Sequence, residues 1–284
     1  MKLYTFTVPF DARSGRLLPL AGRMLPEVPE YVLREAFKKR DVKVNGQRVG
    51  MDAMLEPGAE VKIYARETET KAVSIPVVYE DEQVLVVLKP AGVSCEADAK
   101  GGQTLTQLLC KPDQPEPLLC HRLDNPTEGL IVLAKTPEAQ LELQQAFRER
   151  RIHKTYVCLV RGTPSPEHAV LRHYLIKDAR KAQVRVQDSP ASGAKIVITE
   201  YTVMEAGECA RLKVDLHTGR THQIRAHMAY IGHPLLGDDL YGDRAFNKEH
   251  KTRKLMLCSA ELRFEVEGQL KYLNDRVFTA KPSF

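Results

Sequence analysis

Short runs in which apolar residues dominate or alternate with polar ones recur along this chain, and they predict β-strands. These runs lie at residues 42–49, 60–64, 75–92, 130–134, 153–160, 165–204, 212–216 and 254–264. Asn45-Gly46 stands between β-type residues and predicts a two-residue hairpin turn. Glu80-Asp81-Glu82 divides the run at 75–92, which predicts a second hairpin that ends at a Lys-Pro-Ala-Gly turn.

Helical spacing of apolar residues is found in fewer segments. Pro29 can open a helix whose apolar side holds Val32, Leu33, Ala36 and Phe37. Thr136-Pro137 is typical of an N-cap followed by the first helical residue, so a helix is expected up to the arginines at 148–151. Shorter helices are predicted around residues 105–110 and after Thr218-Gly219, the second with Ile224, Met228 and Ile231 on one face.

The order of these elements predicts two domains. Residues 1–66 form a small α+β module, and residues 67–74 are a polar linker that lacks large apolar side chains over most of its length. Residues 75–284 form the large domain, which is long enough to bury a substantial core.

The amino-acid composition indicates which class of protein this is. The chain has 284 residues, 43% hydrophobic and 28% charged, which is ordinary for a globular protein. No apolar run approaches a membrane span and the first residues lack a secretory core, so we expect a cytoplasmic protein without membrane contact. Six cysteines without close pairs favour reduced thiols over zinc or disulfides. The histidines at 217, 222 and 227 are spaced by five residues, which does not favour a metal site.

The charge is mildly basic, with a formal net charge of +5. A nucleic-acid partner is compatible with this charge but not required by it. Basic runs at residues 38–40, 148–151 and 251–254 are either solvated surface or contacts to phosphate.

The segment from Leu119 to Ala134 carries the strongest candidate chemistry. His121-Arg122-Leu123-Asp124 precedes the turn formers Asn125-Pro126-Thr127-Glu128-Gly129, and an apolar strand follows. Asp124 is thus expected on a turn backed by a rigid strand, where a carboxylate can be held still and yet be reached. A simpler interpretation is that Asp124 and Asn125 only form the turn.

This segment resembles the signature of pseudouridine synthases of the RluA type, in which the Asp is catalytic. The resemblance implies an α+β catalytic domain with a mixed, mainly antiparallel central sheet and flanking helices. It also implies that Asp124 is the catalytic residue and that no cofactor or metal is needed. One position departs from the family pattern, since Glu128 stands where Ser is usual.

A second segment is similar to the same family. It runs from Gly219-Arg220-Thr221-His222-Gln223-Ile224-Arg225 to Gly237-Asp238-Asp239-Leu240-Tyr241-Gly242. We place Arg220 in the first turn of the helix, which is unfavourable for a cation unless a carboxylate compensates it. The resemblance implies that Arg220 pairs with Asp124.

Further residues take roles from the resemblance. Lys154-x-Tyr156 resembles a second active-site element in which the Tyr stacks on the target base, although Tyr156 alone could be an ordinary core aromatic. Arg122 lies where a side chain can hold the flipped nucleotide. Leu216 and Ile224 are expected as apolar walls of the pocket, and Lys154 as a contact to RNA.

The N-terminal module partly resembles the S-four-like RNA-binding domain. A basic helix end at Lys38, Lys39 and Arg40 precedes the Val-Asn-Gly turn and the strand at 60–64. These three residues are therefore candidate RNA contacts. A small α+β module of another function would fit the same pattern.

Together these features predict a monomeric RNA pseudouridine synthase that acts on structured RNA, with ribosomal RNA favoured over transfer RNA. Two alternatives remain open at this stage. One is an RNA-binding protein without catalytic activity. The other is a glycoside hydrolase that uses Asp124 and Glu128 as its carboxylate pair.

Overall fold

The computed structural model describes residues 1–10, 15–25, 28, 30–51, 53–65, 74–96, 103–111, 114–178 and 183–284. Its fold divides into two compact units. One contains residues 1–74 together with 96–104, and the other contains residues 75–95 and 105–284. The segment expected as a linker lies outside the described residues except for Ser74.

The first unit is a small α+β fold. Its sheet has the order β1-β6-β3-β4, with a separate pair β2-β5 and two helices. The bounds are β1 Lys2–Thr7, β2 Gly15–Arg16, α1 Leu17–Met24, α2 Glu30–Lys38, β3 Val42–Val44, β4 Gln47–Arg48, β5 Met54–Leu55 and β6 Glu60–Ala65.

The predicted hairpin and the predicted helix are confirmed in this unit. Asn45 and Gly46 have φ values of 48° and 84°, as a two-residue turn between β3 and β4 requires. The four apolar residues expected on one side of α2 are all buried in the core of the unit. Helix α1 was not predicted because it contains Pro19. Proline is tolerated there since it lies in the first turn, where its missing N–H has no partner to lose.

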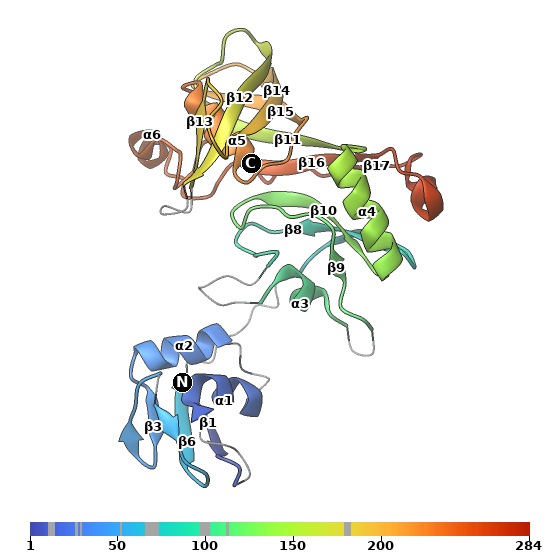
Figure 1. Ribbon diagram of the computed structural model, residues 1–284. Coiled ribbons are helices and arrows are strands. Elements are labelled where there is room, and N and C mark those ends of the chain that lie inside the picture. The colour runs from blue at the N-terminus through green and yellow to red at the C-terminus, as the bar shows by residue number, and fades with distance from the viewer. Residues whose placement is uncertain are drawn as a thin grey trace. The chain divides into compact units, whose positions relative to one another are not determined.

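The second unit is built on one large sheet (Figure 1). Nine strands follow the order β13-β12-β14-β15-β11-β16-β10-β8-β7, while β17 pairs with β16 and β9 with β10. The bounds are β7 Val77–Glu80, β8 Val84–Lys89, β9 Leu118–Leu119, β10 Glu128–Ala134, β11 Ile152–Arg161, β12 His168–Asp178, β13 Gln183–Gln187, β14 Lys195–Glu205, β15 Cys209–Leu216, β16 Leu257–Phe264 and β17 Val277–Thr279.

The sheet is mixed but mainly antiparallel, as expected. Among the described strands the parallel pairing is that of β10 with β16, where Gly129 lies opposite Ser259. Gly129 has a φ of 113°, and a Cβ atom there would lie 2.3 Å from the Ser259 carbonyl oxygen. Only glycine allows the strands to approach this closely. The glycine of the Thr-x-Gly motif is therefore a packing requirement directly behind the Asp124 turn.

The central strands bury side chains on both faces, which explains their continuous apolar sequence. On β10, Ile131 and Leu133 belong to one core cluster, and Leu130 and Val132 belong to the opposite one.

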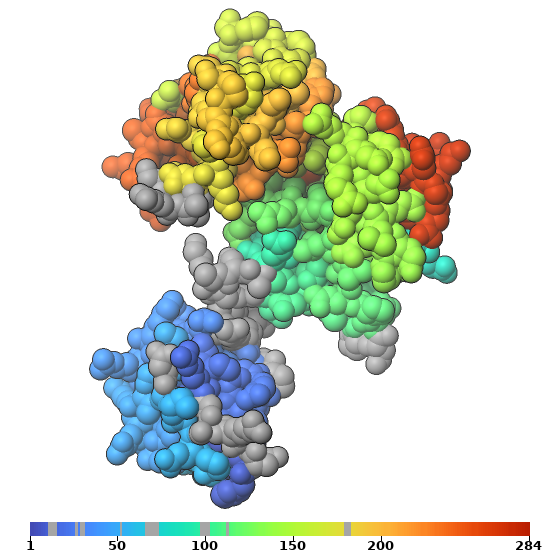
Figure 2. All heavy atoms as spheres, viewed as in Figure 1, coloured from blue at the N-terminus to red at the C-terminus, as the bar shows by residue number. Residues whose placement is uncertain are grey.

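Helices cover both faces. The bounds are α3 Leu105–Leu109, α4 Pro137–Glu149, α5 Gln223–Tyr230, α6 Arg244–Glu249 and the 3-10 helix η1 Gly268–Leu273. Helix α4 begins as predicted, because the Thr136 hydroxyl accepts a hydrogen bond from the Ala139 N–H at 3.2 Å. The atoms of α4 adjoin those of η1 in the space-filling view (Figure 2), where the Glu142 carboxylate accepts from the Leu270 N–H at 3.1 Å. Helix α6, η1 and β17 were not predicted from the sequence.

Candidate functional site

The loop that carries Asp124 is fixed by the turn that follows β8. The Asn125 carbonyl oxygen accepts hydrogen bonds from the Gly92 N–H at 2.8 Å and from the Lys89 ammonium at 3.1 Å. The Asn125 amide in return donates to the Gly92 carbonyl and to the Ser94 hydroxyl at 3.2 and 2.6 Å. Asp124 is therefore flanked by a residue whose main chain and side chain are both tied down.

Lys89 is a buried residue that helps to hold the loop of Asp124 in place. Its side chain is 1% exposed, and its ammonium also donates to the carbonyl oxygens of Pro90 and Val93 at 3.0 and 2.8 Å. Burial lowers the pKa of Lys89 from 10.5 to about 8, while the nearby Asp124 carboxylate partly opposes that shift. The Lys-Pro-Ala-Gly turn resembles a family element near the active cleft, but on its own Lys89 could not be distinguished from an ordinary lysine at the end of a strand.

A pocket of about 740 Å³ opens at Asp124. This volume lies within the range of roughly 300–1,000 Å³ that is common for ligand pockets. It is lined by residues of the Asp124 loop, α4, β11, β15, the loop before α5 and the start of α5. Asp124 is the one acidic residue among these lining residues, whereas arginine, lysine and histidine side chains occur on several sides.

All of the candidate residues expected in the large domain line this pocket, namely Arg122, Asp124, Lys154, Tyr156, Leu216, Arg220 and Ile224. Their convergence from three separate segments of the chain was expected. The predicted ion pair between Arg220 and Asp124 was wrong.

The guanidinium opposite Asp124 belongs to Arg225, not to Arg220. Arg225 Nη1 lies 3.7 Å from Asp124 Oδ2, and its side chain is 3% exposed. Arg220 also faces the pocket, but it is an exposed residue of the loop that precedes the helix. The ion pairs of Asp124 in the described part of the chain go to Arg225 and to His222.

The prediction failed because it placed the start of helix α5 too early, with Arg220 in its first turn. Helix α5 begins at Gln223, and the Gln223 side chain closes the preceding loop by accepting hydrogen bonds from the Arg220 N–H at 3.0 Å and the Thr218 hydroxyl at 2.8 Å. Arg225 is thus the cation in the first turn. Such a cation needs a buried carboxylate nearby, and Arg225 has one in Asp238.

Arg225 is held rigidly. Its Nε and Nη2 donate to the two carboxylate oxygens of Asp238 at 2.7 and 2.8 Å, and the Asp238 side chain is fully buried. The ring of Tyr241 lies 5.4 Å from the guanidinium carbon. Burial disfavours the charged form of Arg225, but the bonds to Asp238 outweigh it and raise its pKa. Asp124 therefore faces a permanent positive charge that has a counter-ion of its own.

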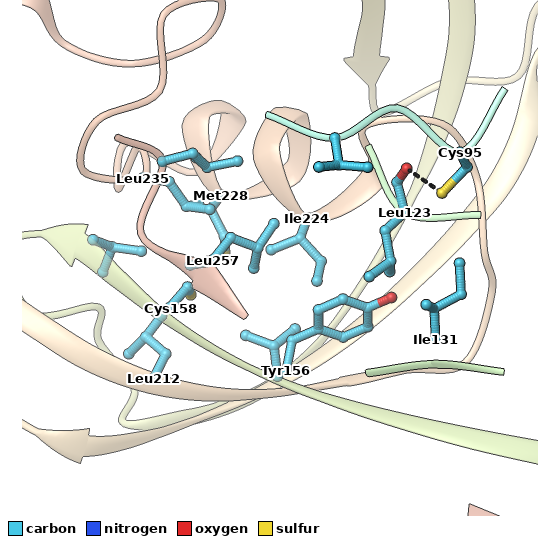
Figure 3. Close-up of a cluster of buried hydrophobic side chains, with 14 of the residues drawn as sticks. Cys95, Leu123, Ile131, Tyr156, Cys158, Leu212, Ile224, Met228, Leu235 and Leu257 are labelled. Atoms are coloured by element: carbon cyan, nitrogen blue, oxygen red, sulfur yellow. Dashed lines mark hydrogen bonds between the residues drawn. The ribbon is translucent and has the colours of Figure 1, made fainter. Parts of the chain in front are cut away.

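Tyr156 forms the floor between Asp124 and the apolar core. Figure 3 shows its ring among the side chains of Leu123, Ile131 and Ile224. The residue is 6% exposed, and burial together with the nearby Asp124 charge raises its pKa, so the hydroxyl stays neutral. The dashed line in Figure 3 joins Cys95 Sγ to the Leu123 carbonyl oxygen, which accepts this hydrogen bond at 3.5 Å.

Basic side chains surround the opening. Arg122, Arg148, Arg150 and Arg220 line it. Lys154 lies deeper, with its ammonium 5.5 Å from the centre of the Phe147 ring, and burial lowers its pKa. An anionic ligand would therefore meet positive charge on its way to Asp124.

Glu128 turns away from the pocket. Its carboxylate pairs with Lys254 at 2.8 Å and accepts from the Ser283 N–H and hydroxyl at 2.8 and 2.9 Å. The residue that departs from the family pattern thus ties the start of β10 to the C-terminal segment. Asp124 and Glu128 do not form the carboxylate pair that a glycoside hydrolase would use.

His121 is a supporting residue that sequence reasoning missed. Its Nε2 accepts a hydrogen bond from the Val132 N–H of β10 at 3.1 Å, and its ring packs on Phe147. Burial, and to a smaller extent Lys154, lowers its pKa to about 3. A neutral ring is also what an accepting Nε2 requires.

The remaining candidates lie elsewhere. Lys38, Lys39 and Arg40 are exposed residues of the first unit, and both lysines form ion pairs with Glu35 at 3.6 and 3.5 Å. The histidines considered as a metal site have separate partners: His217 pairs with Glu200, His222 with Asp124, and His227 with Thr199.

Comparison with known proteins gives a consistent result. Residues 83–230 match the RNA pseudouridylate synthase family. The chain is 31% identical to ribosomal large subunit pseudouridine synthase C of Escherichia coli strain K12, over 91% of this chain and 87% of that protein. It is 32% identical to ribosomal large subunit pseudouridine synthase D of Pseudomonas aeruginosa, over 84% of this chain and 77% of that protein.

The fold is also similar to a solved structure. Human RNA pseudouridylate synthase domain containing 1 superposes with a TM-score of 0.62 and 25% identity, covering 74% of this chain and 83% of that one. None of the helices in the described residues is long and apolar enough to span a membrane.

Proposed function

Because the chain belongs to the RNA pseudouridylate synthase family, we propose that it converts specific uridines of ribosomal RNA to pseudouridine with Asp124 as the catalytic carboxylate. The observation that carries the assignment is the pocket itself, in which Asp124 is the single acidic residue among the described residues that line it and faces Arg225 at 3.7 Å. Ribosomal RNA is proposed as substrate because the relatives are named for the large ribosomal subunit.

The reaction breaks the bond between ribose and base nitrogen, turns the base and joins it again through carbon. No electrons are gained or lost overall. A carboxylate can assist either by acting on the sugar or by adding to the base, and in both cases it must be charged within a partly closed pocket. Arg225 supplies an opposite charge 3.7 Å from this carboxylate.

The other lining residues bind the flipped nucleotide. Stacking on Tyr156 contributes about 1–3 kcal/mol, which offsets part of the cost of a few kcal/mol for removing a base from its stack. Leu216 and Ile224 provide apolar walls, while Arg122, Arg220 and Lys154 contact the RNA backbone.

The test is turnover by Asp124→Asn on large-subunit ribosomal RNA, read by carbodiimide labelling of pseudouridine. We expect no product and a dissociation constant for RNA within about twofold of the wild type, because the change removes one charge and keeps the shape. The control is Glu128→Gln, which alters a carboxylate four residues away that does not line the pocket. Turnover by Asp124→Asn at the wild-type rate would refute the assignment.

We further propose that the first unit binds RNA through Lys38, Lys39 and Arg40 as an S-four-like module, and that the enzyme is a cytoplasmic monomer without a cofactor. The exposed side chains at the end of α2 support the RNA contact. Replacing all three by glutamine should weaken RNA binding and reduce its salt dependence. An unchanged salt slope would count against the contact, and a dimer in sedimentation would count against the monomer.

A further inference from the structure

A histidine held in an unusual backbone conformation stands next to Asp124. His222 is the N-cap of α5 and has φ 53° and ψ 21°, in the left-handed region that residues other than glycine rarely adopt. Its Nε2 lies 3.9 Å from Asp124 Oδ2. Backbone strain of this kind is often kept where a side chain must point in one direction.

Tyr241 determines which nitrogen of His222 carries the hydrogen. The Tyr241 hydroxyl oxygen accepts from the Val184 N–H at 2.9 Å and lies 3.0 Å from His222 Nδ1. Of these two described partners only Nδ1 can accept, so donation by the hydroxyl to Nδ1 is the arrangement in which the phenol hydrogen also has an acceptor. A neutral imidazole with an accepting Nδ1 carries its hydrogen on Nε2, which is the atom directed at Asp124.

The surroundings favour the neutral ring. Burial lowers the pKa of His222, as do Arg225 and Arg122, while Asp124 and Asp238 partly oppose the shift. Tyr241 stays protonated because burial raises its pKa. At neutral pH the ring is therefore an uncharged donor beside the permanent charge of Arg225.

Both donors approach the same oxygen. Arg225 Nη1 at 3.7 Å and His222 Nε2 at 3.9 Å are each nearest to Asp124 Oδ2. These distances exceed a hydrogen bond, and such catalytic contacts commonly shorten when substrate binds. Oδ1 is then the oxygen left for the reacting atoms.

We propose that His222 is a positioning residue that donates from Nε2 to Asp124 Oδ2 and so presents Oδ1 to the target nucleotide, and that Tyr241 fixes it in the donating form. The inference rests on the proposed function of Asp124. In this proposal His222 is a neutral donor that orients the Asp124 carboxylate. A second full positive charge beside this carboxylate would instead weaken its reactivity.

The kinetic test compares His222→Gln with His222→Leu. Neither side chain is β-branched, so the cost of the left-handed backbone is closely matched, but only Gln retains an N–H donor. The loss of a hydrogen bond to a charged group changes a rate by roughly 10- to 100-fold. We therefore expect kcat of His222→Leu to fall by that factor, while its KM for RNA stays within about twofold of the wild type. The kcat of His222→Gln should be at least about fivefold higher than that of His222→Leu. Equal kcat for Leu and wild type would overturn the proposal.

The pH profile separates this role from a structural one. Burial lowers the pKa of His222, so wild-type kcat should begin to fall only at a pH below the ordinary histidine value of 6.5, where the ring becomes a second cation. The glutamine of the His222→Gln variant cannot titrate, so this variant should lack that part of the acidic limb. Identical acidic limbs for wild type and Gln would contradict the proposal.

Nitrogen-15 NMR of the histidine rings tests the tautomer without any assay of turnover, with His222 assigned by its loss in His222→Gln. We expect Nε2–H at neutral pH and a shift toward mixed tautomers in Tyr241→Phe. A dominant Nδ1–H form in the wild type would overturn the inference. Absence of pseudouridine from the wild-type reaction would instead be a failure of the proposed function, and the NMR result would still decide the tautomer.

Discussion

Replacing Arg225 by methionine tests the charge arrangement on which the site depends. The side chain is 3% exposed and its loss leaves Asp238, which is fully buried, without the cation that binds both of its oxygens. Removing one partner of a buried pair costs about 3–5 kcal/mol. Asp238 keeps hydrogen bonds from the N–H groups of Leu240 and Tyr241 at 2.8 and 3.0 Å, so we expect the lower end, about 3 kcal/mol.

For a domain of this size, about 1 kcal/mol corresponds to roughly 2–4 °C, so the melting temperature of the large domain should fall by about 6–12 °C. Turnover should fall at least about 100-fold, because Asp124 loses its opposing charge. Differential scanning calorimetry and the carbodiimide assay measure the two effects.

Arg220→Met is the matched control. It removes an arginine from the same pocket, but an exposed one, so the free energy of unfolding should change by less than about 0.5 kcal/mol. RNA affinity should weaken because a phosphate contact is lost. If both variants were equally stable, or if Arg220→Met were the less stable one, the assignment of Arg225 as the buried partner would be refuted.

Three further outcomes are expected. Gly129→Ala should lose more than about 2 kcal/mol of stability because its Cβ would meet the Ser259 carbonyl oxygen. Gly193 also has a positive φ but has open space around it, so Gly193→Ala should lose only about 1 kcal/mol. Equal losses for the two variants in urea unfolding would contradict this. Lys89→Met should lower kcat and cost about 1–3 kcal/mol by leaving buried carbonyl groups unpaired, and an unaltered kcat would disprove its supporting role. Burial, with a smaller effect of His173, lowers the pKa of His227 from 6.5 to about 4, so the unfolded chain takes up a proton first as the pH falls. Stability should then decrease from about pH 6.5 to 4, by about 3 kcal/mol, and no further below; His227→Asn should remove that part of the pH dependence, and an identical slope would show the argument to be wrong.

Much of the large domain could be predicted because its strands follow simple rules. The apolar runs predicted β8 and β10 as strands, and Thr136-Pro137 predicted the start of α4. Strand β17 and η1 could not be found, because a three-residue strand and a single 3-10 segment have little periodicity and depend on packing against β16 and α4.

The residues predicted for the site in the large domain line one pocket, but Arg225 was missed and the ion pair of Asp124 was predicted with Arg220 instead. Short sequence motifs identify which segments meet, but the partner of Asp124 depends on where α5 begins. That start is set by the Gln223 side chain bonding to the loop before it, which is a tertiary detail. A signal for Arg225 did exist, since an arginine in a first helical turn needs an acidic neighbour and Asp238 lies thirteen residues later.

The parallel pairing of β10 with β16 also bears on synthesis of the protein. Residues 128 and 258 must meet before the Asp124 turn has its full support, so the reaction centre closes only after β16 has left the ribosome. A nascent chain shorter than this should therefore encounter RNA without modifying it. Truncation at residue 250 removes β16 and should therefore abolish turnover.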